Sequence, residues 1–160
     1  MSYHPVNHHP TVFIVDDDPA VRDSLRWLLE SMRLKVLTFE SAEEFLNYYT
    51  MHMIGCLILD VRMPGMSGLQ LQQFLTKQKH ALPIIFITGH GDIPMAVRAM
   101  QAGAMYFLEK PFEDQILLDY VNEALALDKE NQQARIRLAM IQARISNLTE
   151  REREVMNLVS

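Results

Sequence analysis

Acidic, hydroxyl and ammonium side chains recur in this sequence at one kind of position, at the end of a short apolar run. Residues 16–18 are three consecutive aspartates that follow TVFIV, and Asp60 follows CLIL. Thr88 ends PIIFIT, and Lys110 ends MYFLEK. Neighbouring carboxylates repel each other unless a cation binds between them or only one of them points inward. The grouping therefore indicates a cation site that some of these acids share.

The apolar runs have the character of strands in one sheet. They are short, rich in β-branched residues and separated by segments with helical periodicity. We predict strands at residues 11–16, 35–40, 55–60, 83–88 and 105–110, each followed by a helix. Strand–helix units in series, with crossovers of this length, predict an α/β fold with a doubly wound parallel sheet.

Helix-start signals agree with these boundaries. Asp18 precedes Pro19, which is the order of an N-cap residue and a residue suited to the first helical position. Ser41 and Ser67 each begin a capping box with the residue three positions later. Asp92 is predicted to cap the fourth helix. Asp18, the third acid of the DDD run, is thus assigned to a helix cap.

Parallel strands bring their carboxyl ends to one edge of the sheet, where ligands of such folds bind. We therefore expect Asp16, Asp17 and Asp60 to form an oxygen-rich site for Mg²⁺, which prefers hard oxygen ligands in octahedral geometry. Thr88 and Lys110 would bring a hydroxyl and an ammonium group to the same edge.

The composition is that of a globular protein, with 49% apolar and 22% charged residues. A net charge of −5 argues against a broad basic surface for nucleic acid. The single cysteine, Cys56, lies in an apolar run, so we expect a buried thiol and a cytoplasmic location. No apolar run approaches the roughly 18–20 residues of a membrane span.

The first ten residues have no apolar core and do not resemble a signal peptide. We predict that residues 1–10 form a flexible tail. Three histidines in this segment, His4, His8 and His9, leave a metal site as the less favoured alternative.

The motifs VDDD, LILDVRMPGMSG, FITGHGD and EKPF resemble, in order and spacing, those of the receiver domain of bacterial two-component response regulators. The resemblance covers residues 11–128. The segments DVRMPGMSGLQL, TGHGDIPMAVRAMQAGA and FLEKPFEDQ are similar to the FixJ/StyR-like subgroup. This resemblance implies a flavodoxin-like sheet of five strands in the order 2-1-3-4-5.

The resemblance also implies roles for the acidic residues. The position of Asp60 matches the aspartate that accepts a phosphoryl group from a histidine kinase. Asp16 and Asp17 match the acidic pair that holds Mg²⁺, the second directly and the first usually through water. Asp60 and the main-chain carbonyl of Arg62 match the remaining protein ligands. Such a protein catalyses its own phosphorylation and is not an enzyme acting on another substrate.

Residues on the fourth and fifth strands match the family's phosphoryl contact and switch. Thr88 matches the hydroxyl that bonds the phosphoryl group, and Lys110 matches the ion-pairing lysine. Phe107 matches the aromatic residue that swings inward, here without the hydroxyl of the common tyrosine; ordinary core packing is the alternative. Pro111 matches a cis proline. We expect His90 at the surface of the loop after Thr88.

Helical character continues beyond the expected end of the receiver near Leu127, without Gly or Pro. An alternating three-four spacing continues along this segment: Leu117, Tyr120, Ala124, Leu127, Asn131, Ala134, Leu138, Ile141, Ile145 and Leu148. This seam predicts a linker helix at residues 129–147 that forms a parallel two-stranded coiled coil, with Asn131 fixing the register. The alternative is a helix that packs its stripe on its own chain.

Residues 148–160 include LTEREREVMNLV, which resembles the opening helix of a LuxR-type helix-turn-helix domain. Thr149 and Glu152 form a further capping box, so we predict a new helix from Glu150. The recognition helix that reads DNA is not in this sequence. The resemblance implies a transcription regulator that contacts DNA only through a domain mostly outside this chain, with a sensor histidine kinase and a second copy as partners.

Three other interpretations agree less well with these residues. A dehalogenase-type phosphatase would use Asp16 as nucleophile and Asp18 as a second acid, but the acid pair expected after its lysine is missing, since Glu113 and Asp114 lie at a helix start. A flavodoxin-type FMN module needs a Ser/Thr/Gly-rich phosphate loop, and DDDP would repel phosphate. A stand-alone receiver that signals through protein contacts disagrees with the LuxR-like segment.

Overall fold

The computed structural model describes residues 9–89 and 93–159, and the side chains of these up to residue 154. Five parallel strands form one sheet in the order β2-β1-β3-β4-β5. The strands are β1 Thr11–Val15, β2 Lys35–Phe39, β3 Gly55–Asp60, β4 Ile84–Thr88 and β5 Tyr106–Glu109. The helices are α1 Pro19–Ser31, α2 Ala42–Tyr48, α3 Gly68–Thr76, α4 Ile93–Gln101 and α5 Asp114–Val159. The predicted flavodoxin-like α/β fold and its strand order are confirmed.

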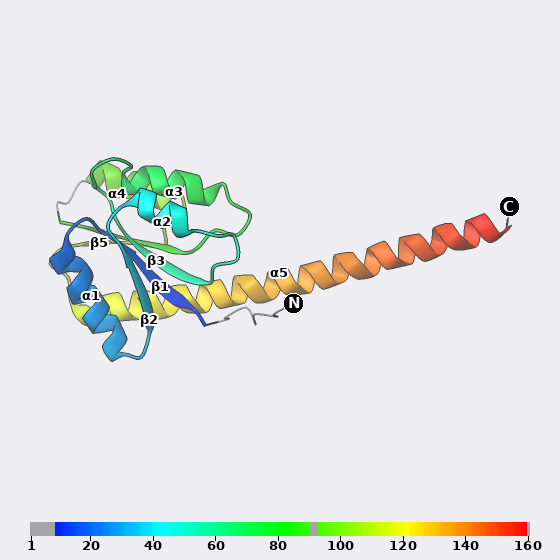
Figure 1. Cartoon of the computed structure of the whole chain (residues 1–160), viewed down its shortest axis with the longest axis horizontal. Coiled ribbons are helices and arrows are strands. Elements are labelled where there is room, and N and C mark those ends of the chain that lie inside the picture. The colour runs from blue at the N-terminus through cyan, green and yellow to red at the C-terminus, as the bar shows by residue number, and fades with distance from the viewer. Residues whose placement is uncertain (1–8, 90–92, 160) are drawn as a thin grey trace. The chain divides into compact units, whose positions relative to one another are not determined.

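Helices cover both faces of the sheet (Figure 1). One core packs α1 and the first part of α5 against alternate strand residues such as Ile14 and Ile58. The other packs α2, α3 and α4 against the intervening residues, such as Phe13 and Leu57. Successive strand side chains point to opposite faces, so a sheet covered on both faces requires the unbroken apolar runs seen in the sequence. Cys56 is fully buried in the first core, and burial raises the pKa of its thiol.

The helix caps follow the predictions closely. The Asp18 carboxylate accepts a hydrogen bond from the Ala20 backbone N–H at 2.9 Å. Both bonds of the capping box at Ser67 are present. At Ser41 the hydroxyl accepts from the Glu44 N–H, but the Glu44 carboxylate accepts from Glu40 rather than from Ser41. The cap predicted at residue 92, the loop histidine at 90 and the tail residues 1–8 lie outside the described residues.

The last helix corrects one prediction. The prediction of a new helix from Glu150 is wrong, because α5 runs without a break from Asp114 to Val159. The Thr149 hydroxyl donates to the Ile145 carbonyl inside the helix instead of capping a helix start. The chain divides into two units, residues 1–128 and 129–160. Among the described residues, no helix is long and apolar enough to cross a membrane.

Candidate functional site

The pairing register of the sheet brings the ends of four strands to one edge. β1 and β3 are paired up to Val15 and Leu59, and β4 and β5 up to Thr88 and Glu109. The polar residues at the ends of these strands therefore gather within a few residues of the same edge. They are the predicted site residues Asp16, Asp17, Asp60, Thr88 and Lys110.

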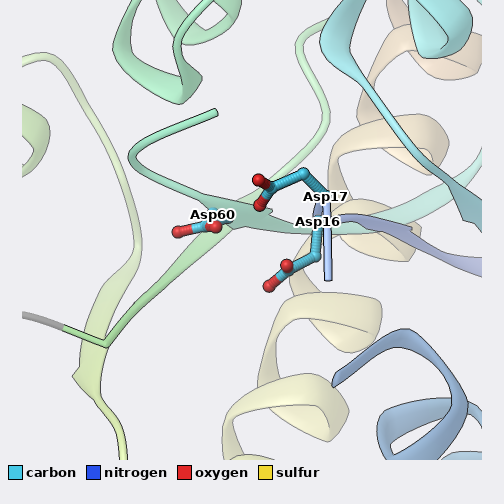
Figure 2. A group of neighbouring side chains, drawn as sticks. All are labelled: Asp16, Asp17 and Asp60. Atoms are coloured by element: carbon cyan, nitrogen blue, oxygen red, sulfur yellow. The ribbon is translucent and has the colours of Figure 1, made fainter. Parts of the chain in front are cut away.

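Three carboxylates form the centre of this group. Asp16, Asp17 and Asp60 each offer an oxygen, and these oxygens lie within 4.8 Å of one another. Their side chains point to the same side of the strand ends (Figure 2). Asp16 is buried, Asp60 is half-buried and Asp17 is exposed. Carboxylates this close repel one another, and a hard divalent cation relieves that repulsion. The donor set is therefore compatible with Mg²⁺.

Asp16 is held more firmly than its two neighbours. Its Oδ2 accepts from the Lys110 ammonium at 3.1 Å, and its Oδ1 accepts from the Asp18 backbone N–H at 2.9 Å. Its side chain is only 4% exposed. Both carboxylate oxygens of Asp16 therefore already accept a hydrogen bond within the protein.

The environment of Asp60 disfavours a bare negative charge. Burial and the neighbouring Asp16 carboxylate raise the pKa of Asp60 from 3.8 to about 6, with a smaller contribution from Asp17. The positive charge of Lys110 and the Arg62 backbone N–H act in the opposite direction but do not cancel the rise. An ionised Asp60 therefore favours a counter-ion at this place.

Thr88 lies on β4, and Phe107 lies on the neighbouring strand, β5. Thr88 is buried at the last position of β4, and its carbonyl accepts from the Lys110 N–H at 2.7 Å. Phe107 is half-buried and packs against the core below α2–α4, with its ring centroid 6.2 Å from that of Phe86. The peptide bond from Lys110 to Pro111 is cis, as the resemblance implied.

Arg22 supports the site and was not singled out by sequence reasoning. Its Nη1 donates to the main-chain carbonyl of Asp16 at 2.7 Å, and Nη2 lies 3.8 Å from a Glu40 carboxylate oxygen. The guanidinium thereby links α1 to the ends of β1 and β2. An arginine on an amphipathic helix is usually a solvent-facing residue, so the sequence did not indicate that Arg22 contacts the site.

The loop after Asp60 has two further supports. The Glu43 carboxylate on α2 accepts from the Met66 N–H at 2.7 Å, which lowers the pKa of Glu43. Gly68 begins α3 so close to β3 that an added Cβ would lie 2.1 Å from the Asp60 carbonyl oxygen. The only sequence signal for this approach was a glycine directly after the predicted N-cap, Ser67.

Comparison with known proteins agrees with this geometry. Residues 12–122 match the response regulator receiver domain. The chain belongs to the response regulator receiver family. The chain is 47% identical over 149 residues to the transcriptional regulatory protein TdiR of Thauera aromatica, covering 93% of this chain and 66% of TdiR. It is 48% identical, with the same coverage, to nodulation protein W of Bradyrhizobium diazoefficiens.

Solved structures give the same family and fold. The response regulator StyR has a TM-score of 0.85 and 52% identity, covering 94% of this chain and 76% of that structure. Full-length FixJ from B. japonicum has a TM-score of 0.72 and 39% identity, covering 86% and 68%. The resemblance to the FixJ/StyR-like subgroup is confirmed. The chain spans about two thirds, 66%, of the length of the curated relatives TdiR and nodulation protein W.

Proposed function

We propose that this receiver accepts a phosphoryl group on Asp60 from the phosphohistidine of a sensor kinase and thereby controls a transcriptional output. One observation carries the proposal: a half-buried Asp60 lies beside two further carboxylates and close to Lys110. The three carboxylates favour a bound divalent cation, and that cation together with Lys110 would neutralise the charge of a phosphoryl group.

The transfer requires little beyond positioning and charge neutralisation. An Asp60 carboxylate oxygen forms a bond to phosphorus while the P–N bond to the donor imidazole breaks, and the departing nitrogen takes up a proton. Bound at Asp16, Asp17, Asp60 and the Arg62 carbonyl, Mg²⁺ would neutralise charge on the transferred oxygens. Lys110, whose ammonium group bonds Asp16, would supply a second positive charge near Asp60. Autophosphorylation from small donors and loss of the group to water belong to the same proposal.

The proposed readout starts at Thr88. Its hydroxyl would move toward the phosphoryl group and bond it. This movement opens space behind β4, and Phe107 fills that space from β5. Phe107 has no hydroxyl, so the switch is a change in packing alone. Its half-buried position against Phe86 supports a residue that can pack in two ways.

The output is proposed to lie C-terminal to the receiver. Residues 1–10 would form a tail, 11–128 the receiver, 129–147 a linker helix and 148–160 the start of a LuxR-type domain. TdiR and FixJ are named transcriptional regulatory proteins, which supports a DNA-binding output outside the receiver. Homodimers, formed on phosphorylation or through the linker, would present that output. The sensor kinase would take its phosphoryl group from ATP in the cytoplasm, so the transfer to Asp60 would take place there.

Intact mass spectrometry tests the proposal. The chain is incubated with phosphoramidate, with and without Mg²⁺, and compared with Asp60→Asn. We expect the mass of one phosphoryl group on the parent with Mg²⁺, and none without Mg²⁺ or in the variant. No transfer to the parent in the presence of Mg²⁺ would refute the phosphoacceptor role.

Two neighbouring variants separate the metal site from general damage. Asp17→Asn removes a carboxylate of the cluster, so we expect weaker Mg²⁺ binding and slow phosphorylation. Asp18→Asn is the matched control because asparagine also caps helices and Asp18 is not part of the cluster. Equal loss in both variants would contradict the metal assignment.

A further inference from the structure

The second unit of the chain exposes a regular row of large apolar side chains. Along α5, Leu138, Ile141, Ile145 and Leu148 are between 52% and 59% exposed. They recur at spacings of three, four and three residues, which place them on one face of a helix. Within the described part of this unit, nothing buries that face.

The same spacing has a different environment earlier in α5. Leu117 and Ala124 occupy equivalent positions and are fully buried in the core beneath the sheet. The row therefore serves the receiver's own core up to Ala124, and its next member, Leu127, is already 37% exposed. A row of four large apolar side chains repeating every 3.5 residues is complementary to an identical helix.

We propose that residues 131–148 pair with the same segment of a second copy as a parallel two-stranded coiled coil. In this register Asn131, Leu138 and Ile145 occupy a positions, and Ala134, Ile141 and Leu148 occupy d positions. Asn131 at an a position is satisfied opposite another asparagine in a parallel, in-register dimer. This fixes one alignment of the two chains.

The flanking charges favour the parallel orientation. In a parallel pair each g residue faces the e residue five positions later on the other helix. Glu130 at g then lies opposite Arg135 of the second copy, which is an attractive pair. An antiparallel pair would instead bring the two g rows together, where Arg137 and Arg144 repel each other.

The seam is short, so the pairing is weak by itself. It contains less than three heptads, and the next a position is Glu152, which is charged and exposed. Asn131 and the small Ala134 reduce the apolar contact further. We expect a dissociation constant on the order of 10–100 μM, which a second contact between receivers would strengthen. The pairing does not depend on phosphoryl transfer.

Sedimentation equilibrium of the intact chain tests the seam. We expect concentration-dependent dimers of the parent and at least a tenfold weaker association of Leu138→Lys plus Ile141→Lys. The matched control is Ile136→Lys plus Met140→Lys, which are 54% and 58% exposed on the same helix but lie outside the a and d positions. The control should associate within about threefold of the parent, since its charges lie at f and c positions.

A parent that stays monomeric at several hundred micromolar, or a control as weak as the seam variant, would overturn the proposal. Circular dichroism checks that both double variants keep the parent's helix content. The outcome is independent of phosphorylation, because Asp60→Asn should dimerise like the unphosphorylated parent. Failure of the phosphoacceptor role and failure of the seam are therefore distinguishable.

Disulfide trapping tests the orientation. Asn131→Cys places identical a positions side by side only in a parallel pair, so we expect a covalent dimer on mild oxidation. Ile136→Cys, on the outer face, should form it much more slowly. Cys56 is fully buried and does not compete. Trapping of Asn131→Cys no faster than Ile136→Cys would exclude the parallel register.

Charge reversal gives a second measure of orientation. Glu130→Arg should weaken the dimer, and adding Arg135→Glu should restore it, because the reversed pair attracts again in the parallel arrangement. Failure of the double variant to recover would exclude the Glu130–Arg135 contact.

Discussion

At the scale of single residues, the environment behind the proposed role of Asp60 has a cost in stability. Its carboxylate is half-buried and faces two other acids, while Lys110 compensates only in part. The groups that support the proposed phosphoacceptor role therefore also destabilise the metal-free fold when Asp60 is ionised.

The pH dependence of stability follows from this environment. Because the folded state holds the pKa of Asp60 at about 6 rather than 3.8, folding takes up a proton between these values. We expect the free energy of unfolding of the metal-free protein to decrease as the pH rises from about 4 to about 6, apart from other titrating groups. Urea unfolding in EDTA, for the parent and Asp60→Asn, isolates this dependence by difference.

The sign of the stability difference between the parent and Asp60→Asn depends on Mg²⁺. Without Mg²⁺ at pH 7, we expect Asp60→Asn to be more stable than the parent by about 1 kcal/mol, since solvent screens a half-buried charge. With saturating Mg²⁺ the parent should gain stability and the variant much less, because binding to the folded state stabilises it. An Asp60→Asn variant less stable than the parent in EDTA would contradict the raised pKa.

At the scale of elements, the close approach of α3 to the end of β3 sets the position of Asp60. An alanine Cβ at residue 68 would lie 2.1 Å from the Asp60 carbonyl oxygen, which is backbone and cannot rotate away. We expect Gly68→Ala to lower the free energy of unfolding by about 1–3 kcal/mol and to slow phosphorylation. Chemical unfolding and the mass assay measure both effects.

Gly89 provides the matched glycine-to-alanine control. It is exposed after β4, with no atom within 4 Å of an added Cβ. We expect Gly89→Ala to change stability by less than about 0.5 kcal/mol. A similar effect of both substitutions would mean that backbone freedom, rather than the contact with Asp60, is responsible.

The other end of β3 is fixed by a buried carboxylate from α5. Asp128 is 3% exposed, and its Oδ2 accepts from the Gly55 backbone N–H at 2.8 Å. Asp128→Ala leaves that N–H buried without this acceptor, so we expect a loss of about 2–3 kcal/mol in the free energy of unfolding. Urea unfolding should show a smaller loss for Asp128→Asn and almost none for Asp119→Ala, an exposed residue of the same helix.

At the scale of the whole molecule, the two parts of α5 differ in stability. In the receiver, Leu117, Val121 and Ala124 of α5 are fully buried, whereas Leu138 and Ile145 in the second unit are more than half exposed. Helices without tertiary packing are marginal in water. The two segments should therefore open independently of each other.

Hydrogen exchange followed by mass spectrometry measures this difference. In dilute solution we expect strong protection of residues 117–128 and fast exchange of residues 135–150. Raising the protein concentration should protect the second segment in the parent but not in Leu138→Lys plus Ile141→Lys. Strong protection of the second segment at low concentration would mean that its apolar row is covered within one chain.

The sequence by itself determined the fold, the strand order through the family resemblance, and the residues of the acidic cluster. Unbroken apolar runs identify strands covered on both faces, and the parallel connection then brings Asp16, Asp17 and Asp60 to one edge regardless of packing details. Caps such as Asp18 and Ser67 were predictable for the same reason: they satisfy local backbone donors.

Only the tertiary structure decided how that cluster is held. The Arg22 bond to the Asp16 carbonyl, the Glu43 bond to the loop and the Asp128 bond to Gly55 join residues whose separation in sequence carries no periodic signal. The capping box at Thr149 failed as a prediction because a serine or threonine hydroxyl bonds the preceding turn equally well inside a helix. Local patterns fix local backbone bonds, whereas long-range contacts depend on how the completed elements pack.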